Sequence, residues 1–119
     1  MSANIILVHD DPRFIEEAAA ALRTAGHDVS TFQDPLDALN AIEAAPRFEI
    51  LVTRVQFAPG RPNGLALSNM ARMKLPGIKV LFTVAPQNVE YTKREGEFVV
   101  APIDLPELVA AVCRLAESS

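Results

Sequence analysis

The stretch NIILVHDDP, residues 4–12, decides the fold. Its nearly continuous apolar run at 4–8 predicts a strand that is buried on both faces of a sheet. Polar residues follow at once, and Asp11 and Pro12 suit the N-cap and the first position of a helix. A buried strand that leads directly into a helix is the repeating unit of a parallel α/β fold.

The same alternation continues along the chain. Apolar runs predict further strands at 28–32, 48–53, 78–84 and 97–100. Helical patterns lie between and after them at 12–25, 34–45, 64–74 and 104–117, with a weaker polar segment of about two helical turns at 86–96. Strands that alternate with helices predict right-handed crossovers and helices on both faces of the sheet. We therefore expect a three-layer α/β/α sandwich around a five-stranded parallel sheet.

Composition limits the classes of function. The 119 residues, half of them hydrophobic, suffice for one domain, 1–119. A net charge of −4 argues against direct nucleic-acid or anionic-membrane binding, and no apolar stretch approaches the ~18 residues of a membrane span. The lone Cys113 cannot form an internal disulfide, so we expect a cytoplasmic protein. We interpret Cys113 as a packed hydrophobic residue; a reactive thiol is the alternative.

Functional residues of parallel α/β sheets lie beyond the carboxyl ends of the strands. This rule selects the residues that follow the first, third, fourth and fifth predicted strands. They are His9, Asp10, Asp11, Arg54, Thr83, Val84, Ala101 and Pro102.

Four pieces of the chain, in order, resemble the receiver domains of two-component response regulators. IILVHDDP (5–12) resembles the family's first strand and acidic cluster. EILVTRVQFAPGRPNGLAL (49–67) resembles the third strand, the phosphoacceptor position, the loop proline and the glycine that opens the third helix. KVLFTV (79–84) and FVVAPIDLPEL (98–108) resemble the fourth strand with its hydroxyl residue and the fifth strand with its Lys-Pro pair. The resemblance implies a flavodoxin-like sheet of order 2-1-3-4-5.

Typical receivers bind Mg²⁺ with acidic residues and phosphorylate an Asp at the end of the third strand, with a hydroxyl and a Lys on the phosphoryl oxygens. This sequence departs from that set at three positions. His9 stands at the first acidic position, Arg54 at the phosphoacceptor and Ala101 at the Lys. If Asp10 and Asp11 are instead the acidic pair, the acceptor and the Lys are still missing.

The missing acceptor is not restored by a shift of alignment, because the chain has no Asp between 37 and 104. A guanidinium does not accept a phosphoryl group. We therefore expect neither aspartyl phosphorylation by the family's mechanism nor a specific Mg²⁺ site. Arg54 either forms charge-assisted hydrogen bonds with the aspartates or points into solvent.

The remaining candidates have more ordinary expectations. We expect His9 to be a structural residue at a strand end, with neighbouring carboxylates that favour its charged form, and His27 to face solvent. Thr83 is either a relic or a hydrogen-bond partner. The resemblance implies a cis bond before Pro102 and places Phe98 at a switch-aromatic position, where we expect packing.

The favoured function is a signalling module without enzymatic activity or cofactor, which binds a protein partner or a second copy independently of phosphorylation. Alternatives are a phosphorelay receiver with another acceptor residue, a phosphatase-type enzyme and a flavodoxin-like cofactor binder. The last two fit poorly, because the phosphatase lacks a second acid and HDDP (9–12) offers negative charge to a cofactor's phosphate.

Overall fold

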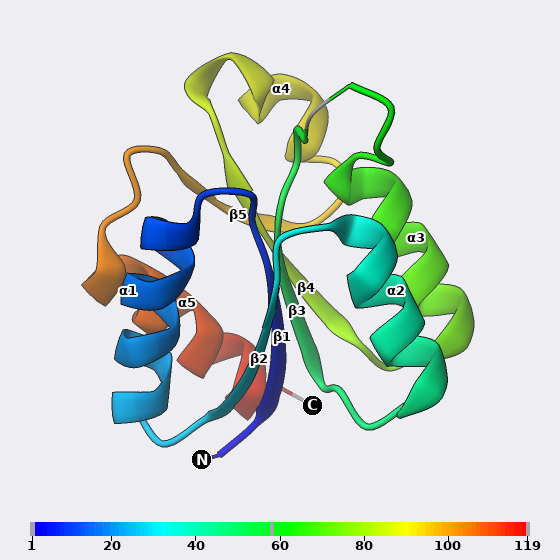
Figure 1. The fold of residues 1–119 in the computed structure, drawn as a ribbon. Helices are drawn as coiled ribbons and strands as arrows, with labels where there is room; N and C mark the ends of the chain where they lie inside the picture. Colours follow the sequence, from blue (N-terminus) through cyan, green and yellow to red (C-terminus); the bar gives the residue numbers. More distant parts are fainter. Residues whose placement is uncertain (1, 58, 119) are drawn as a thin grey trace.

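The computed structural model describes residues 2–57 and 59–118. In this part of the chain a five-stranded parallel sheet of order β2-β1-β3-β4-β5 lies between two helical layers, which confirms the predicted fold (Figure 1). The strands are β1 (Asn4–Val8), β2 (Asp28–Phe32), β3 (Ile50–Arg54), β4 (Lys79–Val84) and β5 (Glu97–Val100). The helices are α1 (Pro12–Thr24), α2 (Pro35–Ala44), α3 (Gly64–Lys74), α4 (Val89–Thr92) and α5 (Leu105–Glu117), with a 3-10 turn η1 (Pro86–Asn88) before α4.

The helices begin where capping side chains occur in the sequence. Asp11, Asp34 and Asp104 accept hydrogen bonds from backbone N–H groups in the first turns of α1, α2 and α5. Asn63 does the same for α3. These caps satisfy donors that have no partner within the helix itself, so the start of each helix is fixed locally.

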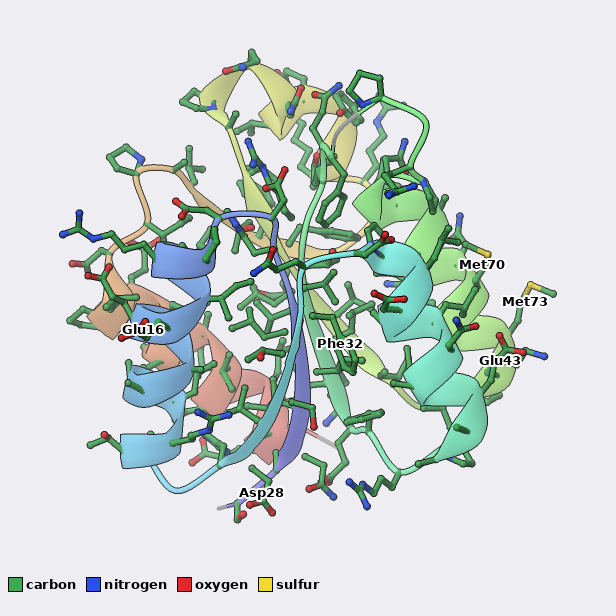
Figure 2. All side chains as sticks on the ribbon, in the orientation of Figure 1. Glu16, Asp28, Phe32, Glu43, Met70 and Met73 are labelled. Carbon is green, nitrogen blue, oxygen red and sulfur yellow. The ribbon has the colours of Figure 1, made fainter. Side chains whose placement is uncertain are left out.

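Two hydrophobic cores hold the layers together. On one face of the sheet, β-strand residues such as Leu7 and Val52 pack against α1 and α5. On the other face, residues such as Ile6 and Leu51 pack against α2 and α3. The side-chain view shows both spaces between sheet and helices filled (Figure 2). Because the central strands contribute to both cores, they read in sequence as continuous apolar runs.

Small differences from the expected boundaries occur at strand starts and in the fourth helix. β3 begins at Ile50 rather than at 48, although Glu49 N–H still donates to Asn4 O at 2.8 Å. The weak segment after β4 forms a 3-10 turn and then one α-helical turn. Within the described residues, no helix combines the length and the apolar composition needed to cross a membrane.

The prediction that His27 faces solvent is wrong. His27 is only 4% exposed, its Nδ1 accepts a hydrogen bond from Ala3 N–H at 3.1 Å, and its Nε2 lies 3.9 Å from Cys113 Sγ. Gly26 causes this inward turn, because its φ of 100° reverses the chain after α1. His27 therefore joins the start of β1 to α5, and Cys113 is half-buried beside it.

Candidate functional site

A row of four side chains crosses the carboxyl edge of the sheet. Residues two apart on a strand share a face of the sheet. Each member of the row lies two positions after a buried residue that faces α1 and α5. The buried residues are Leu7, Val52, Leu81 and Val99, and the row that follows them is His9, Arg54, Thr83 and Ala101. The strand pairing extends to both ends of the row, because His9 N–H donates to Phe32 O and Ala101 N–H donates to Val84 O. The row thus follows the strand order β1-β3-β4-β5.

Arg54 at the end of β3 is paired with Asp10, not with Asp11. Its Nη1 donates to Asp10 Oδ1 at 2.5 Å, and the two side chains are 41% and 36% exposed. Asp11 instead caps α1, where its Oδ1 accepts a hydrogen bond from Arg13 N–H at 3.0 Å. An ion pair this exposed contributes about 0–1 kcal/mol of stability. It fixes the direction of the guanidinium more than it stabilises the fold.

The His9 side chain lies beside this pair and is 13% exposed. Its Nδ1 accepts a hydrogen bond from Asp11 N–H at 3.1 Å, and its ring centroid lies 4.4 Å from that of Phe14. Burial, followed by the positive charge of Arg54, lowers the pKa of His9 to about 4, although Asp10 and Asp11 act to raise it. The two carboxylates thus act in the expected direction, but burial and Arg54 outweigh them, so the prediction that the charged form of His9 is favoured is wrong. The neutral ring carries its proton on Nε2, since Nδ1 is the acceptor.

Thr83 on β4 is the strand partner of Arg54 on β3. The residue is 4% exposed, and its Oγ1 is buried without a partner among the described residues. The bond between Ala101 and Pro102 is cis. Phe98 is partly buried and packs against the core on the α2/α3 side, next to its strand partner Phe82. The packing expected for Phe98 is thus observed.

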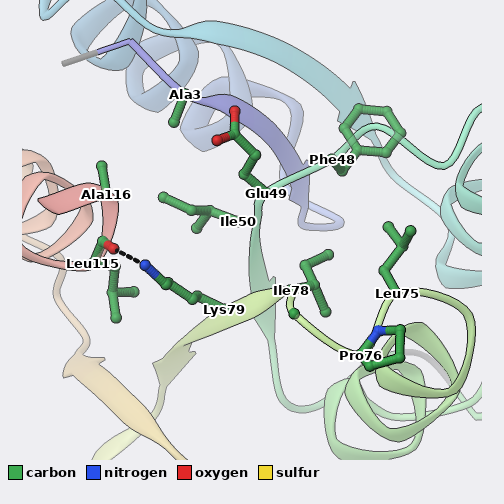
Figure 3. Close-up of a pocket in the computed structure, with 11 residues that line it drawn as sticks. Ala3, Phe48, Glu49, Ile50, Leu75, Pro76, Ile78, Lys79, Leu115 and Ala116 are labelled. Atoms are coloured by element: carbon green, nitrogen blue, oxygen red, sulfur yellow. Dashed lines mark hydrogen bonds between the residues drawn. The ribbon is translucent and has the colours of Figure 1, made fainter. Parts of the chain in front are cut away.

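A cavity of about 350 Å³ at the opposite, amino-terminal edge of the sheet is a weaker candidate site (Figure 3). Lys79 points into it, but its Nζ donates to the carbonyl oxygens of Leu115 and Ser118 at the end of α5. The Glu49 carboxylate there accepts a hydrogen bond from Asn4 N–H at 2.9 Å. Both charged groups of this cavity therefore have structural partners.

A smaller cavity of about 260 Å³ opens at the row itself. Arg54, Thr83 and Ala101 line it from the sheet, His9 and Asp11 from the segment after β1, and Phe14 and Ile103 from the first turn of α1 and the segment before α5. Sequence reasoning selected the three sheet residues from the rule for strand ends. It missed Phe14 and Ile103, whose apolar character at the start of a helix and after a proline signals ordinary packing.

The donor set at this edge does not fit Mg²⁺. Hard divalent cations take several oxygen ligands, whereas a fixed guanidinium here occupies one carboxylate and Asp11 is engaged by α1. Over residues 2–57 and 59–118, no three His, Cys, Asp or Glu side chains gather as a metal-binding cluster.

Comparison with solved structures places this fold among receiver domains. A response regulator receiver protein from Sinorhizobium medicae superposes with a TM-score of 0.88 at 18% identity, covering 98% of this chain and 96% of that one. A receiver domain protein from Clostridium thermocellum gives 0.84 at 15% identity, with 95% and 93% covered. NtrX from Brucella abortus, solved in complex with ADP, gives a TM-score of 0.88 at 25% identity. The match covers 98% of this chain and 27% of that one. No protein-family model matches the sequence.

The chain thus has the fold of response regulator receiver domains. These identities are low, so the likeness defines the architecture. The chemistry has to be argued from the residues of the row.

Proposed function

We propose that residues 1–119 form a receiver-like domain that acts in cytoplasmic signal transduction by binding a protein partner, without aspartyl phosphorylation. The observation that carries the proposal is the position of Arg54. It stands at the end of β3, where the family's acceptor is expected, and its guanidinium is hydrogen-bonded to Asp10. The loop between β3 and α3, residues 55–63, contains no Asp or Glu that could attack a phosphoryl donor.

The ion pair between Arg54 and Asp10 gives this edge of the sheet a charged link that is always present. In typical receivers a metal and a phosphoryl group form such a link only reversibly. A guanidinium stays charged at all physiological pH values, and here it joins β3 to the loop after β1. The carboxyl edge is therefore held in one charge state. On this proposal no phosphorylation step changes the surface of the domain, and regulation comes from what binds to it.

The partner surface is expected to differ from that of typical receivers. Members of the family commonly use the face made by the fourth helix, fifth strand and fifth helix, and here α4 has only four residues. Tyr91 on α4 and Val100 on β5 are 46% and 37% exposed. We propose a protein partner or a second copy of the chain, and neither a nucleic acid nor a membrane, because the net charge is −4.

The proposal is tested with acetyl phosphate and Mg²⁺. The wild-type chain should keep its intact mass and its amide NMR spectrum, because no acceptor is in place. The double variant Arg54→Asp, Ala101→Lys restores the family's acceptor and Lys and is the matched control, expected to gain a phosphoryl group. A phosphoryl adduct on the wild-type chain contradicts the proposal and favours the phosphorelay alternative with another acceptor.

Of the possible other acceptors, His9 is disfavoured by its surroundings. Its ring packs against Phe14 and its Nδ1 accepts a hydrogen bond from the Asp11 N–H. An enzymatic function is disfavoured as well, because the row contains no free carboxylate beside a second acid. We therefore propose a binding module and not a catalyst.

A further inference from the structure

Two side chains at the cavity have hydrogen-bonding groups that the described residues leave unused. Arg54 carries five N–H donors, and among the described residues its side chain makes one hydrogen bond, to Asp10. The Thr83 hydroxyl, 4% exposed, has no partner in the described part of the chain. A buried hydroxyl without a partner costs about as much as a lost hydrogen bond. The cavity therefore favours a ligand that offers acceptor oxygens.

The position of the two groups makes one ligand able to reach both. Arg54 and Thr83 are register partners on β3 and β4 and line the same cavity. Partners on adjacent parallel strands project from the same face at neighbouring positions. A carboxylate has two oxygens in a plane and accepts well from a guanidinium.

The two aspartates do not oppose an anion as strongly as their number indicates. Asp10 is already paired with Arg54. Asp11 faces the positive end of α1, where it accepts the Arg13 N–H, and so part of its charge is compensated. His9 is neutral near pH 7, because burial and then Arg54 lower its pKa to about 4. The free N–H groups of Arg54 are thus the main charged donors at the cavity.

The cavity is small, about 260 Å³, and one part of its wall is apolar. His9 and Asp11 also line it, and the apolar part is formed by Phe14, Val84, Ala85, Ala101 and Ile103. Such walls favour a short hydrocarbon group over a hydrated one. They disfavour inorganic phosphate, which has no apolar side.

Building on the proposed function, we infer that this cavity binds a small carboxylate with a short apolar group, non-covalently, through Arg54 and the Thr83 hydroxyl. The carboxylate belongs either to a free acid or to an Asp or Glu side chain of the partner. Occupation of the cavity gives the unphosphorylated edge a second state. No bond is made or broken.

Sodium isobutyrate is the probe, titrated into the full chain at constant ionic strength and followed by amide NMR. We expect saturable shifts at Thr83, Val84, Ala101 and Ile103, with a dissociation constant of about 1 mM, ordinary for so small a ligand. Isobutyramide, which is neutral and of the same shape, should bind at least about tenfold more weakly. A short blocked peptide with one Glu is titrated in parallel. Tighter binding of the peptide than of isobutyrate indicates a side chain of the partner, and tighter binding of isobutyrate indicates a free acid.

Two variants and a control test the assignment to residues. Thr83→Val keeps the shape and removes the hydroxyl, so it should fold at least as well as wild type and bind isobutyrate about tenfold more weakly. Arg54→Gln should lose binding by a similar factor or more. Thr31→Val, at an exposed threonine on β2, should change neither folding nor binding.

Three results overturn the inference. They are no saturable shift with any carboxylate, equal binding of isobutyramide, and unchanged affinity in Thr83→Val. Preferential binding of inorganic phosphate would also contradict the assignment to carboxylates. The acetyl phosphate experiment on wild-type protein is read separately by mass, so failure of the ligand inference and failure of the phosphorylation-independent function are distinguishable.

Discussion

A methyl group added at Gly64 tests how α3 is seated on the end of β3. A Cβ on this residue would lie 2.0 Å from Arg54 O, 2.9 Å from the Arg54 carbonyl carbon and 3.0 Å from Val55 Cα. All three are backbone atoms, so no side-chain rotation relieves the overlap. Gly64 N–H also donates to Val55 O at 2.7 Å, and any separation of helix from strand lengthens that bond.

We expect Gly64→Ala to lower the free energy of unfolding by about 2–3 kcal/mol. Overpacking of a tight contact costs about 1–3 kcal/mol. Weakening the hydrogen bond to Val55 adds about 0.5–1.5 kcal/mol. The higher helix propensity of alanine offsets at most about 1 kcal/mol of this.

Urea denaturation followed by circular dichroism measures the effect. With a slope of about 1.5–2 kcal/mol per molar urea, the midpoint should fall by about 1–2 M. Gly77→Ala is the matched control, because a Cβ there has no heavy atom within 4 Å. Its free energy of unfolding should differ from that of the wild type by less than about 0.5 kcal/mol. A wild-type midpoint for Gly64→Ala would refute the direct seating of α3 on the β3 backbone.

Three further predictions concern the row. Because burial, then Arg54, lowers the pKa of His9 from 6.5 to about 4, the unfolded chain takes up a proton below about pH 6.5 that the folded chain does not. The free energy of unfolding should therefore decrease, by at most ~3 kcal/mol, as the pH is lowered from 6.5 to about 4. His9→Gln should remove this part of the pH dependence, measured by urea titrations at several pH values. A double-mutant cycle of Arg54→Met and Asp10→Asn should give a coupling energy of only about 0–1 kcal/mol, since both side chains are partly exposed; a value above about 2 kcal/mol would contradict this. Arg54→Asp makes the local charge two units more negative and should gain Mg²⁺ affinity over wild type in calorimetric titration; equal affinity would show that Arg54 is not what opposes the metal.

The fold was predictable because its signals are local and repeated. Central strands such as 4–8 are buried on both faces and read as unbroken apolar runs, and capping residues such as Asp11 and Asp104 mark helix starts. The strand order came from the resemblance, since alternation alone does not fix it. The segment at 86–96 gave only a weak helical signal because it is short, polar and poor in apolar periodicity, and in the structure only four of its residues form α4.

The site was predictable in its members but not in its interactions. The rule for strand ends selects Arg54 and Thr83, but a sequence gives no distances, and only the structure shows that Arg54 pairs with Asp10 and not with Asp11. The charge state of His9 was mispredicted because burial outweighs its carboxylate neighbours, and burial depends on Phe14 packing over the ring. His27 was mispredicted because the turn at Gly26 decides its direction.

The geometry of β3 explains why an arginine is tolerated at its end. Residues 50–53 of this strand are buried, whereas the Arg54 side chain is 41% exposed at the edge. The pairing of Arg54 with Thr83 uses backbone groups, which are the same for every side chain except proline. The identity of residue 54 therefore affects the chemistry of the row far more than the stability of the sheet. Since the same reasoning applies to Ala101 beyond β5, both positions can change without loss of the fold, and likeness of fold alone does not establish phosphorylation.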